Sequence, residues 1–222
     1  MNKKVLTLCA AMLLCGSSLM PVYAGAVDLS SLKGEAGIEL SAGRMTLTSD
    51  YELTDQKDYL LLDEDNFVLD GNGYTFTGRI VVTGNHVTIK NVVFDYTNVF
   101  KYNVPGEDGT VSINKNAITV ISEGATIENC TITCKAEDEH YLANGITILP
   151  TSEDAEFLIK NNTIINANAI VGQWPASGIQ IVEGSANSGL EGASTSVALK
   201  DFNVAESIVG NTFENVATDY AY

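Results

Sequence analysis

The residues best suited to chemistry lie in three stretches that interrupt a regular pattern, at about residues 95–116, 133–144 and 166–177. Each contains aromatic side chains, whose faces can stack on the apolar faces of sugar rings. An exposed row of such rings would form a platform for a polysaccharide, whereas rings packed against the protein body would only hold the stretches in place. Both interpretations stay open for Tyr96, Phe100, Tyr102, Tyr141 and the only tryptophan, Trp174.

Carboxylates in the same stretches are candidate ligands for Ca²⁺, which takes six to eight oxygen ligands and could bridge to a uronate. Their spacing matches no calcium-loop motif, and short acidic runs are more often solvated loop tips. The cofactor is therefore unknown, with Ca²⁺ as the candidate. The candidate ligands are Asp108, Glu137, Asp138 and Glu139.

An enzymatic interpretation requires different groups. A polysaccharide lyase needs a base to remove the proton beside a uronate carboxylate, and the candidates here are His140, Lys101 and Lys135. A glycoside hydrolase needs two carboxylates at a set separation, which the sequence does not reveal. The sequence thus leaves open whether the protein is an enzyme.

The elements that must position these groups repeat along the chain. An apolar residue, an asparagine and a second apolar residue recur at residues 87–94, 127–132, 159–164 and 208–213. A strand-like stretch precedes each of them, at residues 80–82, 117–120, 145–148 and 178–181. Repeats of 30 to 50 residues with strand periodicity are typical of solenoids. Since no amphipathic helix separates the strands, we expect an all-β parallel β-helix of about four to five coils.

Asparagine at matching corners tolerates left-handed backbone geometry, and its amide can bond to the asparagine of the next rung. We therefore expect Asn91, Asn129 and Asn161 to form a structural ladder, with Asn162 and Asn211 pairing in the column beside it. Cys130 and Cys134 lie on one strand at even spacing, so their Cα atoms should be about 13 Å apart. This predicts two buried free thiols and no disulfide.

Residues 68–76, which read Val-Leu-Asp-Gly-Asn-Gly-Tyr-Thr-Phe, resemble the first-coil signature of right-handed parallel β-helix proteins of the pectin-lyase-like superfamily. Together with the asparagine segments, the resemblance covers about residues 60–216. It implies the fold but little about activity, because lyases, hydrolases, epimerases, tailspikes and adhesins share this scaffold. The constellation of acids and a basic residue typical of the family's lyases, and the paired aspartates of its hydrolases, find no match here.

The N-terminus has the form of a secretory signal peptide, with a basic head, an apolar run and a small-residue cleavage site near Ala24. We expect a signal peptide at residues 1–24, an N-terminal cap and first strands at 25–66, and the β-helix at 67–222 without an evident C-terminal cap. The protein should thus be exported to the periplasm, cell surface or extracellular space, with no transmembrane segment in the mature chain. No oligomeric state is predicted.

Charge restricts the partners. The full chain has a net charge of −16, and removing Lys3 and Lys4 with the signal leaves ten basic and 28 acidic residues, or −18. Such a surface repels phosphate backbones, so nucleic acid is excluded as a partner. We expect the protein to bind an extracellular polysaccharide or surface partner along stacked corner loops. A lyase or hydrolase and a structural or adhesin spacer remain the alternatives.

Overall fold

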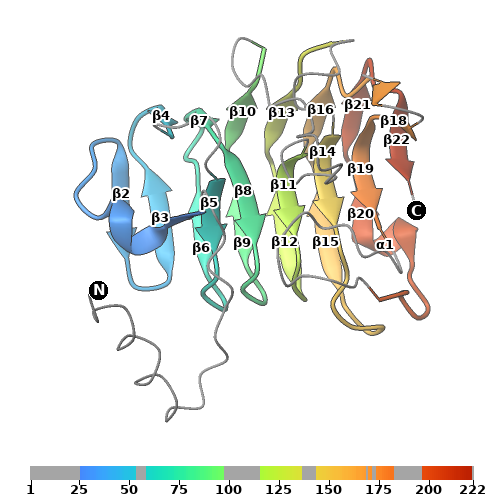
Figure 1. Ribbon diagram of the computed structural model, residues 1–222, viewed down its shortest axis with the longest axis horizontal. Helices are drawn as coiled ribbons and strands as arrows, with labels where there is room; N and C mark the ends of the chain where they lie inside the picture. The colour runs from blue at the N-terminus through green and yellow to red at the C-terminus, as the bar shows by residue number, and fades with distance from the viewer. Residues whose placement is uncertain are drawn as a thin grey trace, which may run out of the picture.

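The computed structural model describes residues 26–53, 59–97, 116–136, 144–168, 170–171, 174–182 and 197–221. Within them the protein is all-β, and most strands pair in parallel (Figure 1). Only two short helical segments occur there, the 3-10 turn η1 (Leu29–Leu32) and the helix α1 (Val204–Ser207). None of the described helices is long and apolar enough to cross a membrane.

Three long parallel sheets make up the body of the molecule. Sheet 1 runs in the order β1 (Ala26–Asp28), β5 (Tyr59–Leu62), β8 (Arg79–Val82), β11 (Asn116–Val120), β14 (Asn144–Ile148), β19 (Ser177–Ile181), β22 (Thr218–Ala221). Sheet 2 contains β2 (Ile38–Ser41), β3 (Arg44–Leu47), β6 (Val68–Asp70), β9 (Thr88–Lys90), β12 (Ala125–Glu128), β15 (Phe157–Lys160) and β20 (Ile208–Val209). Sheet 3 contains β10 (Val93–Asp95), β13 (Thr131–Thr133), β16 (Thr163–Ile165) and β21 (Thr212–Glu214).

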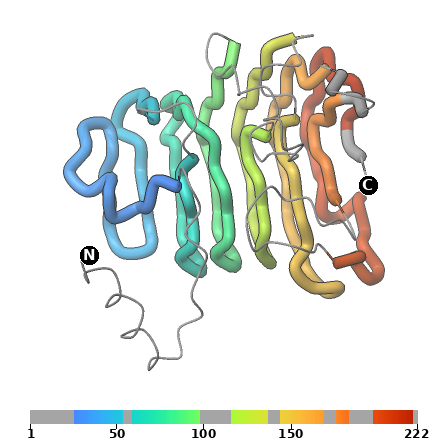
Figure 2. The backbone as a smooth tube through the Cα atoms, in the orientation of Figure 1, coloured from blue at the N-terminus to red at the C-terminus, as the bar shows by residue number. Residues whose placement is uncertain are grey.

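The chain passes through sheets 1, 2 and 3 in succession, and each such passage forms one turn of the stack. Each turn lies beside the previous one (Figure 2). The pair β4 (Tyr51–Glu52) and β7 (Phe76–Thr77) continues sheet 3 through a bridge between Thr75 and Val93. With that pair counted, β5 to β21 form five turns within the described residues, and β1, β3 and β4 form one before them. This arrangement is compatible with a β-helix solenoid, and the expected four to five coils are exceeded by the N-terminal turn.

The N-terminal part of the chain is built into this stack. β1 and β3 pair in parallel with β5 and β6, while β2 folds back on β3 as an antiparallel edge strand. The 3-10 turn between β1 and β2 buries Leu29 and Leu32 in the core. The region that the sequence divides into a cap and first strands therefore contributes to the same core as the later turns.

Inward-facing aliphatic side chains stack from turn to turn and form the core. In sheet 1 the aligned residues Leu60, Ile80, Ile118, Ile146 and Ile179 are all fully buried. β-branched side chains suit this packing because their restricted rotamers fit a pleated surface. The alternation seen in the sequence thus corresponds to the inner and outer faces of the sheets.

The asparagine corners follow the predicted backbone geometry but not the predicted hydrogen bonds. Asn91, Asn129 and Asn161 have φ values of 54°, 55° and 56°, and Gly210 has 66° at the same corner of the last turn. The amide of Asn91 donates to Asp70 Oδ1 at 3.0 Å, whereas the side chains of Asn129 and Asn161 are exposed and not bonded to each other. The predicted amide ladder in this column is wrong, because the left-handed conformation directs these side chains outward.

The ladder lies one residue further along, where pairing of Asn162 with Asn211 was predicted and is confirmed. Asn162 Oδ1 accepts from Cys130 N–H at 2.9 Å, and Asn211 Oδ1 accepts from both Asn162 N–H and Asn162 Nδ2 at 2.9 and 3.0 Å. Asn162 Nδ2 also donates to Ile127 O at 2.9 Å, and Asn211 Nδ2 donates to Ile159 O at 2.8 Å. The buried amide of Asn162 is therefore fully paired.

The two cysteines of this region are free and buried, as predicted. Burial raises the pKa of each thiol to about 12. A thiol with so high a pKa is a weak nucleophile and a poor metal ligand at neutral pH, so both residues act as small core side chains.

Asp70 fixes the first turn of the asparagine-bearing region. Its carboxylate accepts from Asn72 N–H at 3.0 Å and from Asn91 Nδ2, and it lies 2.6 Å from Arg44 Nη2 and 3.7 Å from Lys90 Nζ. Burial alone would raise the pKa of Asp70, but the bonds from Asn91 and Asn72 and the charges of Lys90 and Arg44 outweigh it and lower the pKa. Asp70 therefore stays ionised and ties three chain segments together.

Replacing Asn162 with leucine should lower the free energy of unfolding by about 2–4 kcal/mol, because Cys130 N–H and Ile127 O lose their buried partner. The matched control is Asn161→Gly, at an exposed position with positive φ, which should change stability by less than about 0.5 kcal/mol. Urea unfolding followed by circular dichroism measures both. Equal losses in the two variants would contradict the assigned ladder.

The lowered pKa of Asp70 predicts a pH-dependent contribution to stability. The ionised carboxylate stabilises the fold above the unfolded-state pKa, and this contribution is lost as pH falls through the folded-state pKa. Asp70→Asn should therefore lower stability by about 1–2 kcal/mol near pH 7, and the difference from the parent chain should shrink as pH falls through the lowered folded-state pKa. Urea unfolding across the acidic pH range tests the prediction, and a difference that stays constant as the pH falls would contradict it.

Candidate functional site

The three chemically interesting stretches emerge from a single corner of the molecule, between sheet 3 and sheet 1. The first connects β10 to β11, the second connects β13 to β14, and the third connects β16 to β19. Because β10, β13 and β16 are adjacent and in register, and so are β11, β14 and β19, the roots of the three insertions lie in consecutive turns. The third includes a short antiparallel pair, β17 (Ile170–Val171) and β18 (Trp174–Pro175).

A second amide ladder fixes the points where the insertions rejoin sheet 1. Asn144 Nδ2 donates to Asn116 Oδ1 at 2.9 Å, and Ser177 N–H donates to Asn144 Oδ1 at 2.9 Å. Asn116 Nδ2 in turn donates to Thr119 Oγ1 at 3.3 Å. The sequence analysis missed this ladder, although its signal is visible in the paired strings Asn-Ala-Ile-Thr at 116–119 and Asn-Gly-Ile-Thr at 144–147.

In its central strands, β5, β8, β11 and β14, sheet 1 differs from the other two sheets because its outward side chains are also buried. Arg79, Thr119 and Thr147 are 2%, 1% and 4% exposed, while outward residues of sheets 2 and 3, such as Thr126 and Thr163, are only half-buried. Thr147 Oγ1 has no hydrogen-bond partner within the described residues. A buried polar group without a partner costs free energy. This face therefore places a cation, hydroxyls and amides, which call for polar partners, next to the insertion roots.

Tyr96, at the root of the first insertion, corrects one prediction. It is fully buried, its ring stacks on Phe94 with centroids 6.2 Å apart, and its hydroxyl donates to Gly78 O at 2.7 Å. Burial, together with the nearby Cys134, raises the pKa of Tyr96 well above its usual value, and Arg79 opposes this shift. Tyr96 therefore anchors the insertion to the core, and its assignment to an exposed sugar-binding row is wrong.

The other predicted site residues are placed only in part. Lys135 is half-buried at the root of the second insertion, and Trp174 lies in β18, where it pairs with Val171. The described residues contain no group of three or more His, Cys, Asp or Glu side chains that could hold a metal ion. The remaining candidates lie outside the described residues: Phe100, Lys101, Tyr102, Asp108, Glu137, Asp138, Glu139, His140 and Tyr141.

A groove that the sequence did not indicate lies at the corner between sheets 1 and 2. It has a volume of about 640 Å³ and lies between the segment that carries Lys200 and Glu206 and two other turns, one with His86 and one with Asp154 and Glu156. Its charges are mixed and exposed, and His86 occupies a turn with a φ of 56°. None of these side chains belongs to the insertion roots, so the groove is separate from the candidate site.

Comparison with known proteins adds no family assignment, since no family model, no curated protein and no solved structure matches this chain. The candidate site therefore rests on the structure and sequence of this chain alone.

Proposed function

We propose that this chain is an exported right-handed parallel β-helix of the pectin-lyase-like kind that binds an extracellular polysaccharide along its stacked corner insertions. The observation that carries the proposal is the placement of three insertion roots at one corner in consecutive turns. Insertions whose roots lie one rung apart begin at the spacing of neighbouring strands, about 4.8 Å. A ligand made of repeating units can use such a surface along its length.

The composition of the insertions supports a sugar ligand. They contain Phe100, Tyr102, Tyr141 and Trp174, whose rings supply apolar faces for stacking on sugars, and their carboxylates and lysines supply hydrogen-bonding groups. The roots are held by the Asn116–Asn144 bond and by buried Tyr96. A fixed base reduces the entropy lost when a loop orders on a ligand.

Charge and export narrow the ligand class. A mature net charge of −18 favours a neutral polysaccharide, or an anionic one bridged by Ca²⁺ through the acidic residues of the insertions. The signal-peptide pattern at residues 1–24 supports export into the compartments where such polymers occur. Right-handed winding is part of the proposal because connections between parallel strands are generally right-handed.

The test is binding of the mature chain to a polysaccharide array, followed by titration calorimetry with the strongest ligand. Trp174→Ala and Tyr141→Ala should each weaken binding by about tenfold or more, as expected for an aromatic anchor. The matched control is Tyr74→Ala, which removes a 36% exposed tyrosine at a different corner and should leave binding unchanged. Thermal melting verifies that all variants fold.

Three outcomes would contradict the proposal. Binding lost through Tyr74→Ala but kept in the insertion variants would move the site to another corner. If the mature chain bound no polysaccharide on the array, the binding function would be wrong and a role as a structural spacer would be favoured. Unsaturated products formed from polyuronate in the presence of Ca²⁺, and abolished by His140→Gln, would identify a lyase instead.

A further inference from the structure

The corner that carries the three insertions has one sheet on each side. On one side, the outer face of sheet 1 is buried in its central strands, where Val81, Thr119 and Thr147 are 1%, 1% and 4% exposed. On the other side, the outward residues of β13 and β16 in sheet 3 are only half-buried. A polymer that extends from the insertions across the strands can therefore reach the outer face of sheet 3 but not that of sheet 1.

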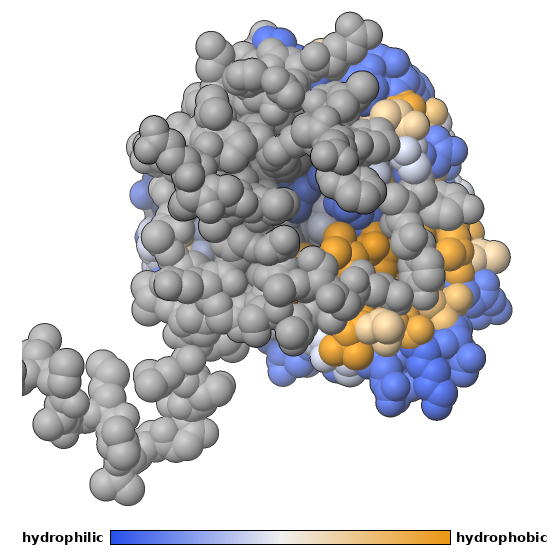
Figure 3. Space-filling model, turned by 45° about the vertical axis from the view of Figure 1, so that its right-hand side comes forward, coloured by the Kyte–Doolittle hydropathy of each residue, from blue (hydrophilic) through white to orange (hydrophobic). Residues whose placement is uncertain are grey.

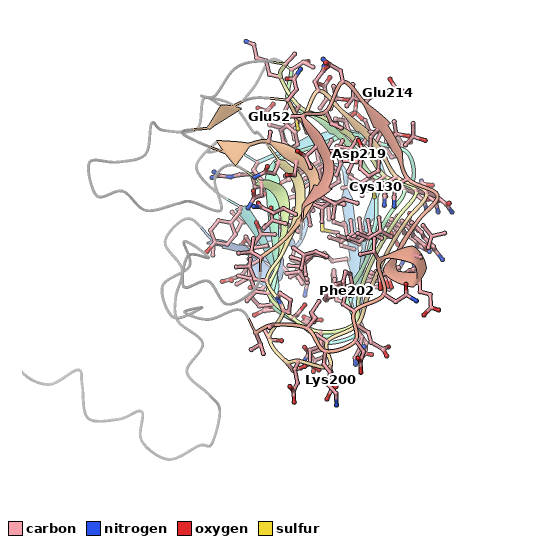
Figure 4. The ribbon with its side chains drawn as sticks, turned by 90° about the vertical axis from the view of Figure 1, so that its right-hand side faces the viewer. Glu52, Cys130, Lys200, Phe202, Glu214 and Asp219 are labelled. Atoms are coloured by element: carbon pink, nitrogen blue, oxygen red, sulfur yellow. The ribbon has the colours of Figure 1, made fainter. Side chains whose placement is uncertain are left out.

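The outward residues of sheet 3 form two columns, and the residues between them point into the core. The first column contains Val93, Thr131, Thr163 and Thr212, and the second contains Asp95, Thr133, Ile165 and Glu214. Figure 4 views the stack along its axis and shows Glu214 on the outside of the last turn. Figure 3 shows apolar surface between hydrophilic areas on the side turned toward the C-terminal end, as expected where inward and outward residues alternate.

This face is uncharged in its central turns. Its charged residues within the described chain, Asp95 and Glu214, lie in the first and last strands of sheet 3. The outer face of sheet 2, by contrast, carries Lys90, Glu128 and Lys160 in the three turns that carry the insertions. In a protein with a mature net charge of −18, a neutral ligand can cover the central turns of sheet 3 without desolvating a charge.

Exposed amides extend the face to the neighbouring corner. Asn129 and Asn161 precede Thr131 and Thr163 by two residues, and their side chains are exposed and have no hydrogen-bond partner among the described residues. Each of these two turns thus presents an amide followed by a hydroxyl. Both groups can donate and accept hydrogen bonds, as the hydroxyls of a sugar do.

The backbone holds these groups at a fixed spacing. Thr131 and Thr163 are paired in register, so their hydroxyls repeat at the distance between neighbouring strands, about 4.8 Å. This spacing is similar to the length of one sugar unit in an extended chain. Because a β-branched side chain has few rotamers, binding through threonine costs little conformational entropy.

We propose that the polysaccharide lies on the outer face of sheet 3 and that it is a neutral polymer. This inference rests on the proposed function and narrows it. The aromatic insertions contact the polymer at the corner, while Thr131, Thr163 and the amides of Asn129 and Asn161 bind sugar hydroxyls beside them. An anionic polymer bridged by Ca²⁺ does not fit, because the central turns of this face carry no carboxylate among the described residues.

The ligand class is tested with soluble polymers in affinity gel electrophoresis. The mature chain should be retarded by at least one neutral polymer among hydroxyethyl cellulose, xyloglucan, galactomannan and arabinoxylan, and EDTA should not change the retardation. Carboxymethyl cellulose and polygalacturonate with Ca²⁺ should bind at least about tenfold more weakly, because the protein is strongly acidic. Binding to polygalacturonate alone, and only with Ca²⁺, would overturn the neutral class but leave the insertion site in place.

Matched double variants test the location. Thr131→Val with Thr163→Val removes two hydroxyls at positions where valine also suits a strand, and should weaken binding of the neutral polymer about fivefold to tenfold. The control is Thr88→Val with Thr126→Val, the same change at two aligned, half-buried threonines of sheet 2, which should leave binding unchanged. Thermal melting verifies that both double variants fold.

The outcomes separate this inference from the proposed function. Equal binding by the two double variants would overturn the role of sheet 3, and loss of binding in Trp174→Ala would then still support the insertion site. Weaker binding in the sheet 2 variant alone would place the polymer on that face instead. Absence of binding to every polymer would overturn both the inference and the proposed function.

Discussion

Register between neighbouring turns is the constraint on which the structure depends. Aliphatic side chains stack only if each strand pairs in register with the aligned strand of the previous turn. A shift of one residue in that pairing would turn the apolar side chains of the strand outward. The corner residues Asn91, Asn129 and Asn161 set this return through their left-handed backbone, and the paired amides of Asn162 and Asn211 hold it from inside. The insertion roots lie in consecutive turns only because this register is kept.

The sequence predicts what repeats. Asparagine segments and alternating apolar residues were sufficient for the all-β class, the corner geometry and the free buried cysteines. Prediction from the sequence failed for residues whose role depends on the direction of the side chain. An aromatic residue after a strand can point inward as Tyr96 does, and an amide in the left-handed conformation can point outward as Asn161 does. Insertions do not repeat, so neither periodicity nor spacing defines their conformation.

The three faces of the stack have different surfaces. On sheet 2 charges alternate between turns, with Lys160 Nζ 2.9 Å from Glu128 Oε2 and Lys90 paired with Asp70, which makes this column neutral in a strongly acidic protein. Sheet 1 is buried on both faces in its central strands, and the insertions rejoin the chain at its edge. The outer face of sheet 2 therefore carries balanced charges, whereas sheet 1 is bordered by the insertions.

The column that contains the amide ladder changes character along the axis, from Val92 through Cys130 to Asn162 and Asn211. Apolar contacts weaken on cooling, whereas amide hydrogen bonds do not depend on the same hydration entropy. Because each turn of such a stack interacts mainly with its neighbours, the two halves are able to respond separately. Within this column, cooling therefore weakens the apolar contacts of Val92 more than the hydrogen bonds of Asn162 and Asn211.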